Sequence, residues 1–557
     1  MVALQKRTLC ELFRAGVAEF SRDIVFSFVG EEPYTYRQVE HQVHQLVQSL
    51  RQRGIRPGDR IALLGDNSPS WCIAYLAIVS MGAVVVPILT EFHKSEIHHI
   101  IRNSNARGLF VTSKLVHKVV ELNIRDLVFV ASLDNQELPL DEKKWVRLSA
   151  LLAGEAPARK QKKLKPLADP GEEDLAEILY TSGTMGHSKG VMLTHANIVS
   201  NVQAGIQAIS ISHSDCFLAI LPLSHAYQCS MGFLAPFLMG SPIYFIKGLP
   251  TAQTLLPAIK EVQPTIILSV PLIMDKIYKK KVLGEINAKP ISKTLYRIGP
   301  MQKVVNRIAG RRLVQAFGSR LRLMIFGGAA TPPDVEAFLH EGGFPYTTGY
   351  GLTECSPLLT VNPIGKVKLQ SAGKAIPGVT LRILDPDPQS GIGEIIARGP
   401  NVMKGYFHNE EATRKAITAE GWFITGDLGL IDSDGYLFIK GRSKNIIVGP
   451  SGENIYPEEL EFHLSQNPCV LESLVYEQAG RITARVYLDM DAMEEAYHLS
   501  RLDGSEAARI VTQKLESIRQ EVNSKVAAYA RIHRIIEQAE EFEKTATKKI
   551  KRYLYIN

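Results

Sequence analysis

The sequence from Tyr180 to His195 reads YTSGTMGHSKGVMLTH and carries the strongest local signal in the chain. It follows the apolar run LAEILY, which is typical of a buried strand, and precedes a segment with helical spacing. Glycines, small hydroxyl side chains and one lysine after a strand form a loop whose amides, hydroxyls and ammonium group can surround phosphate oxygens. We therefore predict a phosphate-binding loop; a glycine-rich surface loop without a ligand is the alternative.

This segment differs from the common P-loop of kinase-type NTPases. That motif needs a Ser or Thr directly after its lysine, because the hydroxyl reaches magnesium. Here Lys189 is followed by Gly190. A kinase-type NTPase is therefore disfavoured, and release of ADP from ATP would revive it.

Outward from this loop, short apolar runs of strand type alternate with segments of helical spacing. Strands that alternate with helices predict an α/β fold with largely parallel sheets, whose ligands bind beyond the carboxyl ends of the strands. The runs are RIALLG from Arg60, GLFVT from Gly108, DLVFVA from Asp126, CFLAILPL from Cys216, TIILSV from Thr265 and LRLMIFGG from Leu321.

The pattern of predicted secondary structure changes at two places along the chain. Residues 370–440 contain short strands and tight turns, which indicate a small antiparallel β subdomain. We expect a large N-terminal domain over 1–440 that includes this subdomain, and a small, mobile α+β C-terminal domain over 441–557. The apolar stretch Cys72–Leu89 is interrupted by Gly82 and Pro87, so we predict a buried helix and a buried strand instead of a membrane span.

Composition narrows the class of protein. The length of 557 residues exceeds what one hydrophobic core supports, and 45% hydrophobic with 22% charged residues is ordinary for a globular enzyme. The net charge of +7 does not by itself indicate nucleic acid. The six cysteines show neither CxxC pairs nor zinc spacing, so we interpret them as reduced thiols. With an N-terminus that lacks a secretory apolar region, a cytoplasmic protein is expected.

The signature TSGTMGHSKGVMLTH resembles that of the adenylate-forming superfamily, which includes acyl-CoA synthetases, luciferases and adenylation domains of peptide synthetases. Further motifs of that family occur in order along nearly the whole chain. They are LPLSHAYQ at Leu221, GGAATPPDV at Gly327, GYGLTE at Gly349, GWFITGDLG at Gly421, GRSKNIIVGPSGENIYPEELE at Gly441 and EKTATKKIKR at Glu543.

The resemblance implies an ATP- and Mg²⁺-dependent enzyme that activates a carboxylate as acyl-AMP and passes the acyl group to CoA. Glu354 matches the magnesium-associated glutamate, and Thr353 the residue that binds the α-phosphate. Thr184 is a second candidate for the metal. Asp427 and Arg442 match the pair that binds the ribose hydroxyls. The implied nucleotide-binding residues also include Thr181, Ser182, Gly183, Lys189, Gly328, Ala329, Tyr350 and Gly351.

Two further catalytic candidates follow from the same resemblance. Lys549 matches the C-terminal lysine that bridges the substrate carboxylate and the α-phosphate, but the local sequence departs from the usual Gly-Lys, which leaves Lys548 as a second candidate. His225 matches a histidine near the substrate carboxylate, with a structural histidine as the alternative. Lys444 lies at the family's hinge, and Gly452 where the pantetheine arm of CoA passes.

The sequence also limits which carboxylic acids are expected as substrates. The pocket segment LPLSHAYQCSMGFLAPF has no aspartate for a substrate ammonium group, and the insertion from Val270 to Arg322 resembles that of bacterial long-chain enzymes. A medium- or long-chain fatty acid is therefore expected. An acyl carrier protein as acceptor, an enzyme that stops at acyl-AMP, and a non-catalytic acyl-binding paralogue stay open.

The segment Ser292–Arg312 is basic and amphipathic, with Lys303, Arg307 and Arg311 four residues apart on one helix face. Such a face is either an ordinary solvated surface or a contact with the inner face of a membrane. Oligomeric state cannot be inferred from the sequence.

Overall fold

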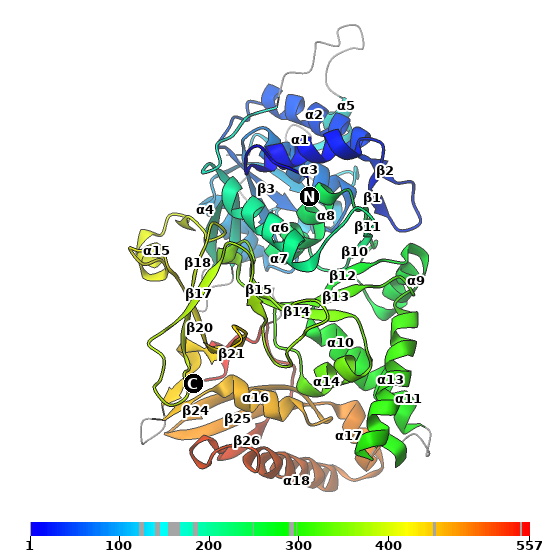
Figure 1. Ribbon diagram of the computed structural model, residues 1–557, viewed down its shortest axis with the longest axis vertical. Helices are drawn as coiled ribbons and strands as arrows, with labels where there is room; N and C mark the ends of the chain where they lie inside the picture. Colours follow the sequence, from blue (N-terminus) through cyan, green and yellow to red (C-terminus); the bar gives the residue numbers. More distant parts are fainter. Residues whose placement is uncertain are drawn as a thin grey trace.

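A computed structural model describes residues 2–121, 127–139, 145–153, 167–181, 188–248, 250–288, 294–296, 298–448, 453–545 and 549–556. In this part of the chain, two large mixed sheets form the upper and middle regions of Figure 1, and a smaller sheet with its helices lies at the lower end. The predicted α/β class with a separate C-terminal region is confirmed.

The first large sheet contains the strand that leads into the predicted phosphate loop. Its neighbours from β4 to β7 pair in parallel, whereas β8, β9 and β19 pair antiparallel at one edge. The order is β19 (Gly405–Tyr406), β9 (Lys189–Thr194), β8 (Leu175–Thr181), β4 (Val84–Ile88), β3 (Arg60–Leu64), β5 (Ala106–Val111), β6 (Phe129–Ser132) and β7 (Trp145–Arg147).

The second large sheet is parallel from β14 to β1 and antiparallel at both edges. Its strands include three of the apolar runs that the sequence singled out, those from Cys216, Thr265 and Leu321. The order is β16 (Lys374–Ala375), β15 (Leu358–Val361), β14 (Tyr346–Gly351), β13 (Leu323–Phe326), β12 (Ile266–Ser269), β10 (Phe217–Ala219), β11 (Ile243–Phe245), β1 (Ile24–Phe28) and β2 (Tyr34–Thr35).

Helix α3 (Pro69–Ser80) is the buried helix predicted from the long apolar stretch. The side chain of Ser68 caps it by accepting a bond from the Trp71 N–H, and Pro69 occupies the first turn, where its missing N–H costs nothing. After Gly82, strand β4 is buried along its whole length. The prediction of a helix and a strand is confirmed, and no helix among the described residues is long and apolar enough to cross a bilayer.

Other helices pack around this core. Helix α3 packs against α1 and α2, and α6 packs against β8 and β9 directly after the phosphate-loop hairpin. A capping box formed by Thr194 and Asn197 fixes the start of α6. The bounds are α1 (Leu9–Phe20), α2 (Tyr36–Gln52), α4 (Lys94–Asn103), α5 (Leu148–Ala153), α6 (His195–Ile209), α8 (Ala235–Met239), α9 (Ala252–Val262) and α14 (Pro333–Glu341).

The region after the large sheets forms a four-stranded antiparallel sheet. Its strands are β17 (Thr380–Leu384), β18 (Gly393–Arg398), β20 (Phe423–Ile431) and β21 (Leu437–Arg442), joined in that order. A short helix, α15 (Glu410–Ala416), precedes β20. The antiparallel texture predicted for this region is therefore present, and β21 extends to Arg442.

The residues after β21 have a hydrophobic core of their own, with members from Ile447 to Ile532. A three-stranded sheet of β24 (Val470–Gln478), β25 (Arg481–Leu488) and β26 (Arg534–Glu537) packs with α16 (Pro457–Ser465) and α18 (Gly504–Asn523). Helix α17 (Met490–Tyr497) follows β25. These elements lie at the lower end of Figure 1.

The insertion between β12 and β13 is helical. Helix α10 (Pro271–Ile277) continues through a π-helical segment, Tyr278–Leu283, into α11 (Gly284–Asn287), and α13 spans Gly299–Ala316. Lys303, Arg307 and Arg311, which the sequence places on one helix face, all lie in α13, and Pro300 lies in its first turn, where proline favours a helix start. Its inner face is tightly packed, since a Cβ on Gly310 would lie 2.3 Å from the carbonyl oxygen of Gly342.

All six cysteines are free and buried, as the interpretation of reduced thiols requires. They lie in several elements, with Cys355 next to the predicted magnesium residue. No group of three or more His, Cys, Asp or Glu side chains that could hold a metal ion occurs in the described ranges. A closed, all-protein metal cage is thus not found in that part of the chain.

Candidate active site

The phosphate loop joins two antiparallel strands. Residue Thr181 at the end of β8 pairs with Lys189 at the start of β9. Lys189 is exposed, and its ammonium lies 5.1 Å from the centre of the Tyr406 ring. The predicted residues Ser182, Gly183 and Thr184 lie outside the described residues.

Glu354 follows the end of β14 in a short 3₁₀ segment, Thr353–Cys355. The hydroxyl of Tyr406 donates a 2.9 Å hydrogen bond to its Oε1. The Glu354 side chain is half-buried, so part of it is open to solvent and can offer an oxygen to an ion. A single carboxylate suits Mg²⁺, which keeps several waters and takes its other ligands from phosphates.

The turn before Glu354 requires a glycine. A Cβ on Gly351 would lie 1.8 Å from the carbonyl oxygen of Pro357, which no side chain can satisfy. Gly351 is therefore needed for local backbone packing, independently of any contact with nucleotide. Thr353 is half-buried beside it.

Asp427 and Arg442 are cross-strand partners on β20 and β21. Nε of Arg442 lies 2.8 Å from Oδ1 of Asp427, and the hydroxyl of Tyr350 donates a 2.6 Å bond to Oδ2. Asp427 is 5% exposed, and this burial raises the pKa of its carboxyl against the opposing charge of Arg442. Each carboxylate oxygen still has a lone pair for a ligand hydroxyl.

Gly328 and Ala329 lie in an exposed loop after β13. Gly328 has a φ of +85°, a left-handed conformation that favours glycine. The loop follows the carboxyl end of a parallel strand, where α/β proteins bind ligands.

His225 is half-buried at the start of a short helix, Ala226–Cys229, and its Nδ1 accepts a 3.3 Å bond from the Tyr227 N–H. Burial and the positive charge of Lys549 lower the pKa of His225 to about 4. The ring is therefore neutral at pH 7, and because Nδ1 accepts, its proton is on Nε2. A π-helical segment follows at Ser230–Leu234, a feature frequent at functional sites.

Lys549 lies in the C-terminal unit, but its charge interacts with residues of this site. It keeps access to solvent, yet desolvation by the surrounding protein and the charge of Arg442 lower the pKa of its ammonium, against the opposing effects of Asp427 and Glu354. The same ammonium acts on His225. Five candidates, from His225 to Lys549, thus lie close enough for their charges to interact. Lys548 lies outside the described residues.

The segment that carries Lys549 is held by the small sheet. Arg552 donates to Oε1 of Glu461 on α16 at 2.7 Å and to the carbonyl of Val475 on β24 at 2.7 Å. Lys544 forms ion pairs with Glu472 and Glu541. These contacts fix the backbone on both sides of the lysine.

Two remaining predictions concern the junction between the units. Lys444 is exposed in a 3₁₀ turn, Ser443–Asn445, directly after β21 and one residue beyond Ser443, whose hydroxyl donates to the Gly426 carbonyl. Among the described residues, its side chain forms no hydrogen bond or ion pair with the other candidate site residues. Gly452 lies outside the described residues.

Sequence reasoning missed Tyr406 and Arg552. The strand that carries Tyr406 is only two residues long, too short for a periodicity signal. Arg552 lies in the motif EKTATKKIKR, but its partner Glu461 is 91 positions away in sequence. A search for buried ion-pair partners cannot be made from one sequence.

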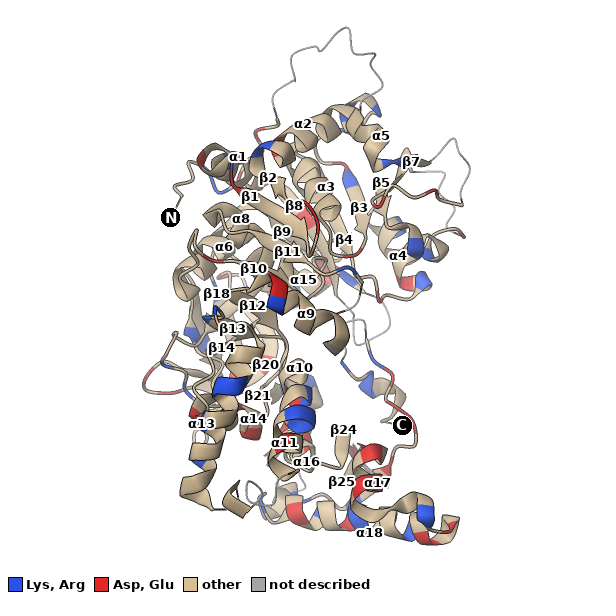
Figure 2. Ribbon diagram, turned by 90° about the vertical axis from the view of Figure 1, so that its right-hand side faces the viewer, with Lys and Arg blue, Asp and Glu red and all other residues tan. Residues whose placement is uncertain are grey.

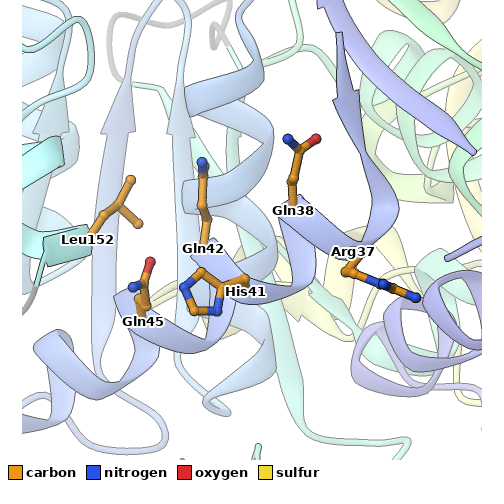
Figure 3. A pocket seen from close by; sticks show the side chains of 6 residues that line it. All are labelled: Arg37, Gln38, His41, Gln42, Gln45 and Leu152. Atoms are coloured by element: carbon orange, nitrogen blue, oxygen red, sulfur yellow. The ribbon is translucent and has the colours of Figure 1, made fainter. Parts of the chain in front are cut away.

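The hollow in Figure 3 is a different surface. Helices α2 and α5 provide all of its lining, and none of the predicted site residues takes part. The lining residues are Arg37, Gln38, His41, Gln42, Gln45 and Leu152. We assign no ligand to this hollow.

Residues 13–407 match the family model described as AMP-binding enzyme, and the chain belongs to this family. It is 30% identical to the long-chain-fatty-acid–CoA ligase FadD15 of Mycobacterium bovis over 489 residues, which cover 83% of this chain and 78% of the relative. It is also 30% identical to the medium-chain fatty-acid–CoA ligase of Escherichia coli, with 79% and 73% of the two chains covered.

The feruloyl-CoA synthase of an Amycolatopsis species is 29% identical, with 86% of each chain covered. Among solved structures, the anthranilate CoA ligase AuaEII in complex with anthranoyl-AMP superposes with a TM-score of 0.79 at 23% identity, covering 98% of this chain and 96% of that one. ATP-bound MatB from Rhodopseudomonas palustris gives a TM-score of 0.78 at 23% identity, covering 99% and 98%. These structures share the fold.

Proposed function

We propose that the chain is an ATP-dependent acid–CoA ligase that forms acyl-AMP and pyrophosphate, and then transfers the acyl group to the thiol of CoA. The observation that carries this proposal is that Lys549 lies close enough to His225 and Asp427 for its charge to affect the pKa of both. A carboxylate that attacks the α-phosphate must approach a polyanion, so cations have to offset the repulsion. The named activities of the relatives FadD15 and the Escherichia coli enzyme agree with it.

In the first half-reaction, the carboxylate oxygen forms a bond to the α-phosphorus while the bond to the pyrophosphate oxygen breaks. We assign to neutral His225 the donation of its Nε2 proton in a hydrogen bond that orients the carboxylate. Lys549 provides the mobile point charge that bridges the carboxylate and the α-phosphate. Its pKa is lowered because the surrounding protein desolvates the ammonium and places it near Arg442. An incoming anion would offset this excess of positive charge.

The nucleotide would be held on both sides of the reacting phosphorus. We assign the ribose hydroxyls to Asp427 with Arg442, and the adenine to Gly328, Ala329 and the Tyr350 ring. Thr353 and the loop residues Thr181, Ser182, Gly183, Thr184 and Lys189 would take the phosphates. Glu354, with Thr184, would hold Mg²⁺, which when bound neutralises phosphate charge.

We also propose that residues 441–557 act as a mobile domain on 1–440, with the hinge at Lys444. Lys549 reaches the cleft only when the small domain closes on it, and the same closure obstructs the approach of a thiol. The second half-reaction would therefore need a rotation, after which the backbone at Gly452 would border the pantetheine arm. The separate hydrophobic core of the C-terminal unit supports independent motion.

For the acid we propose a medium- or long-chain fatty acid. The helical insertion α10–α13, the absence of an aspartate from LPLSHAYQCSMGFLAPF and the names of two relatives support an apolar tail. The feruloyl-CoA synthase shows that an aromatic acid has to be tested beside the fatty acids.

The test is pyrophosphate release with saturated fatty acids of graded length, ferulate and benzoate, each offered CoA, holo acyl carrier protein or no acceptor. We expect AMP and thioester with CoA and a fatty acid. A thioester only with the carrier protein would replace CoA as acceptor, and acyl-AMP that no acceptor discharges would indicate an adenylate-only enzyme. ADP formation or no nucleotide turnover would overturn the proposal.

Finally, we propose that the enzyme meets its lipid substrate at an anionic membrane surface through α13. Lys303, Arg307 and Arg311 are exposed on this helix, whose sequence contains no acidic residue. Val304 and Ile308 lie between them and are 45% and 51% exposed. Figure 2 shows blue segments along α13 and along α10 and α11 of the same insertion. Cations beside exposed aliphatic side chains are the pattern of an interfacial helix.

A further inference from the structure

The short strand β19 lies between two parts of the candidate site. Its backbone is fastened to the strand that starts with Lys189, because the Lys404 and Phe407 N–H groups donate to the carbonyls of Met192 and Gly190 at 2.9 and 2.7 Å. One residue before Lys404, the Met403 N–H donates to the carbonyl of Glu354 at 2.8 Å. Residues 403–407 therefore join the turn that contains Glu354 to the phosphate-loop hairpin.

The side chain of Tyr406 also contacts both charged side chains, Glu354 and Lys189. Its hydroxyl donates to Oε1 of Glu354 at 2.9 Å, and its ring lies 5.1 Å below the ammonium of Lys189. The ring is half-buried, and its hydroxyl is the donor in the bond to Glu354. One rigid residue thus holds a carboxylate and an ammonium at a set separation.

We propose that Tyr406 is a positioning residue that sets the spacing between Glu354, on the metal side of the triphosphate, and Lys189, on its phosphate side. This inference rests on the proposed function. The hydroxyl occupies one oxygen of Glu354, which would leave the other oxygen to hold a metal ion. The ring restricts the motion of the long Lys189 side chain, which lowers the entropy that nucleotide binding would otherwise cost.

Two substitutions separate the two contacts. Tyr406→Phe removes the hydrogen bond to Glu354 and keeps the ring under Lys189, whereas Tyr406→Leu removes both. Tyr436 provides matched controls, because its ring lies under Lys374 at 4.5 Å and its hydroxyl donates to the Lys366 carbonyl at 3.2 Å, away from the site residues. Tyr436→Phe and Tyr436→Leu therefore delete the same groups elsewhere.

The experiment measures equilibrium binding of ATP by calorimetry, with no acid or thiol present, in excess Mg²⁺ and in EDTA. For Tyr406→Phe we expect affinity in Mg²⁺ to fall about tenfold, the scale of a lost hydrogen bond to a charged group, and affinity in EDTA to be unchanged. For Tyr406→Leu we expect a further loss of about threefold that is the same in both conditions. The melting temperatures of the Tyr406 variants should match those of the Tyr436 controls.

A double-mutant cycle gives the second measurement. In a Glu354→Ala background, Tyr406→Phe should no longer change Mg²⁺-dependent ATP affinity, because its partner is gone. Equal loss in Mg²⁺ and EDTA for Tyr406→Phe, no loss at all, or full additivity with Glu354→Ala would each overturn the inference. Failure of the wild-type chain to bind ATP would overturn the proposed function instead, and normal ATP binding with unaffected Tyr406 variants would overturn this inference alone.

Discussion

Nη1 of Arg552 lies 2.7 Å from Oε1 of Glu461, and this ion pair attaches the segment that carries Lys549 to helix α16. Both side chains are mostly buried, and removal of one partner from a buried pair commonly costs about 3–5 kcal/mol. We predict that Arg552→Gln lowers acyl-AMP formation by about ten- to a hundredfold and spares thioester formation from supplied acyl-AMP, with the two half-reactions assayed separately.

Lys551→Gln is the matched control, because its ammonium lies 3.6 Å from Glu543 in a more exposed pair, whose contribution is about 0–1 kcal/mol. Arg552→Lys should recover part of the rate, since it keeps the charge and loses the forked geometry. Equal losses in both half-reactions would mean that Arg552 only stabilises the fold.

The second prediction concerns the hinge. Lys549→Ala should abolish most adenylation and still convert supplied acyl-AMP and CoA to thioester. Lys444→Pro should show the opposite pattern, because proline fixes φ near about −65° and restricts rotation while the helical turn at Ser443–Asn445 is kept. If Lys549→Ala keeps full activity and Lys548→Ala loses it, Lys548 is the catalytic lysine. If Lys549→Ala loses adenylation and thioester formation equally, the two half-reactions do not use different placements of the C-terminal domain.

The third prediction concerns Glu177, which is 2% exposed in β8 and accepts a 3.1 Å bond from the Tyr75 hydroxyl. Burial raises the pKa of this carboxyl to about 8, above its ordinary value of 4.5. The raised pKa means that the folded state binds a proton that the unfolded state releases. The free energy of unfolding should therefore fall as pH rises between about 4.5 and 8.

Glu177→Gln keeps an acceptor for Tyr75 and cannot ionise. Its melting temperature relative to wild type should rise from pH 5 to pH 8, by an amount that corresponds to a few kcal/mol. Tyr75→Phe is the control that removes the hydrogen bond and leaves the carboxyl. Parallel melting curves for wild type and Glu177→Gln across this pH range would contradict the assignment.

The fourth prediction tests the membrane contact. Substitution of Lys303, Arg307 and Arg311 by Gln should weaken sedimentation with anionic vesicles by up to about a hundredfold, since each cation contributes about 1 kcal/mol near such a surface. Ile308→Gln alone should weaken binding by removal of an exposed aliphatic group. The same triple change at Arg501, Arg509 and Lys415, which are exposed elsewhere, is the control. Unchanged binding would leave α13 as an ordinary solvated face.

Much of the fold could be predicted because its strands are local signals. Runs such as TIILSV and LRLMIFGG are apolar on both faces, as strands covered by helices must be, and they became β12 and β13. The helical spacing of Lys303, Arg307 and Arg311 was likewise a local signal, and all three residues lie in α13.

The site was predictable only as a set of motifs. Sequence could name Asp427 and Arg442, but not that they face each other across β20 and β21 with Tyr350 on the second carboxylate oxygen. Links such as Tyr406 to Glu354 span 52 positions and depend on how two sheets are placed in space. No periodicity or local propensity contains that information.

The burial of the cysteines protects them from acylation by the acyl-adenylate, which is a reactive mixed anhydride. An acyl-adenylate acylates thiolates, and self-acylation of the enzyme would compete with transfer to the acceptor. Burial raises the pKa of all six thiols, including that of Cys355, which lies next to Glu354 in the chain. With its own sulfur atoms kept protonated and shielded, the protein presents the activated acyl group to an incoming thiol without offering a rival nucleophile.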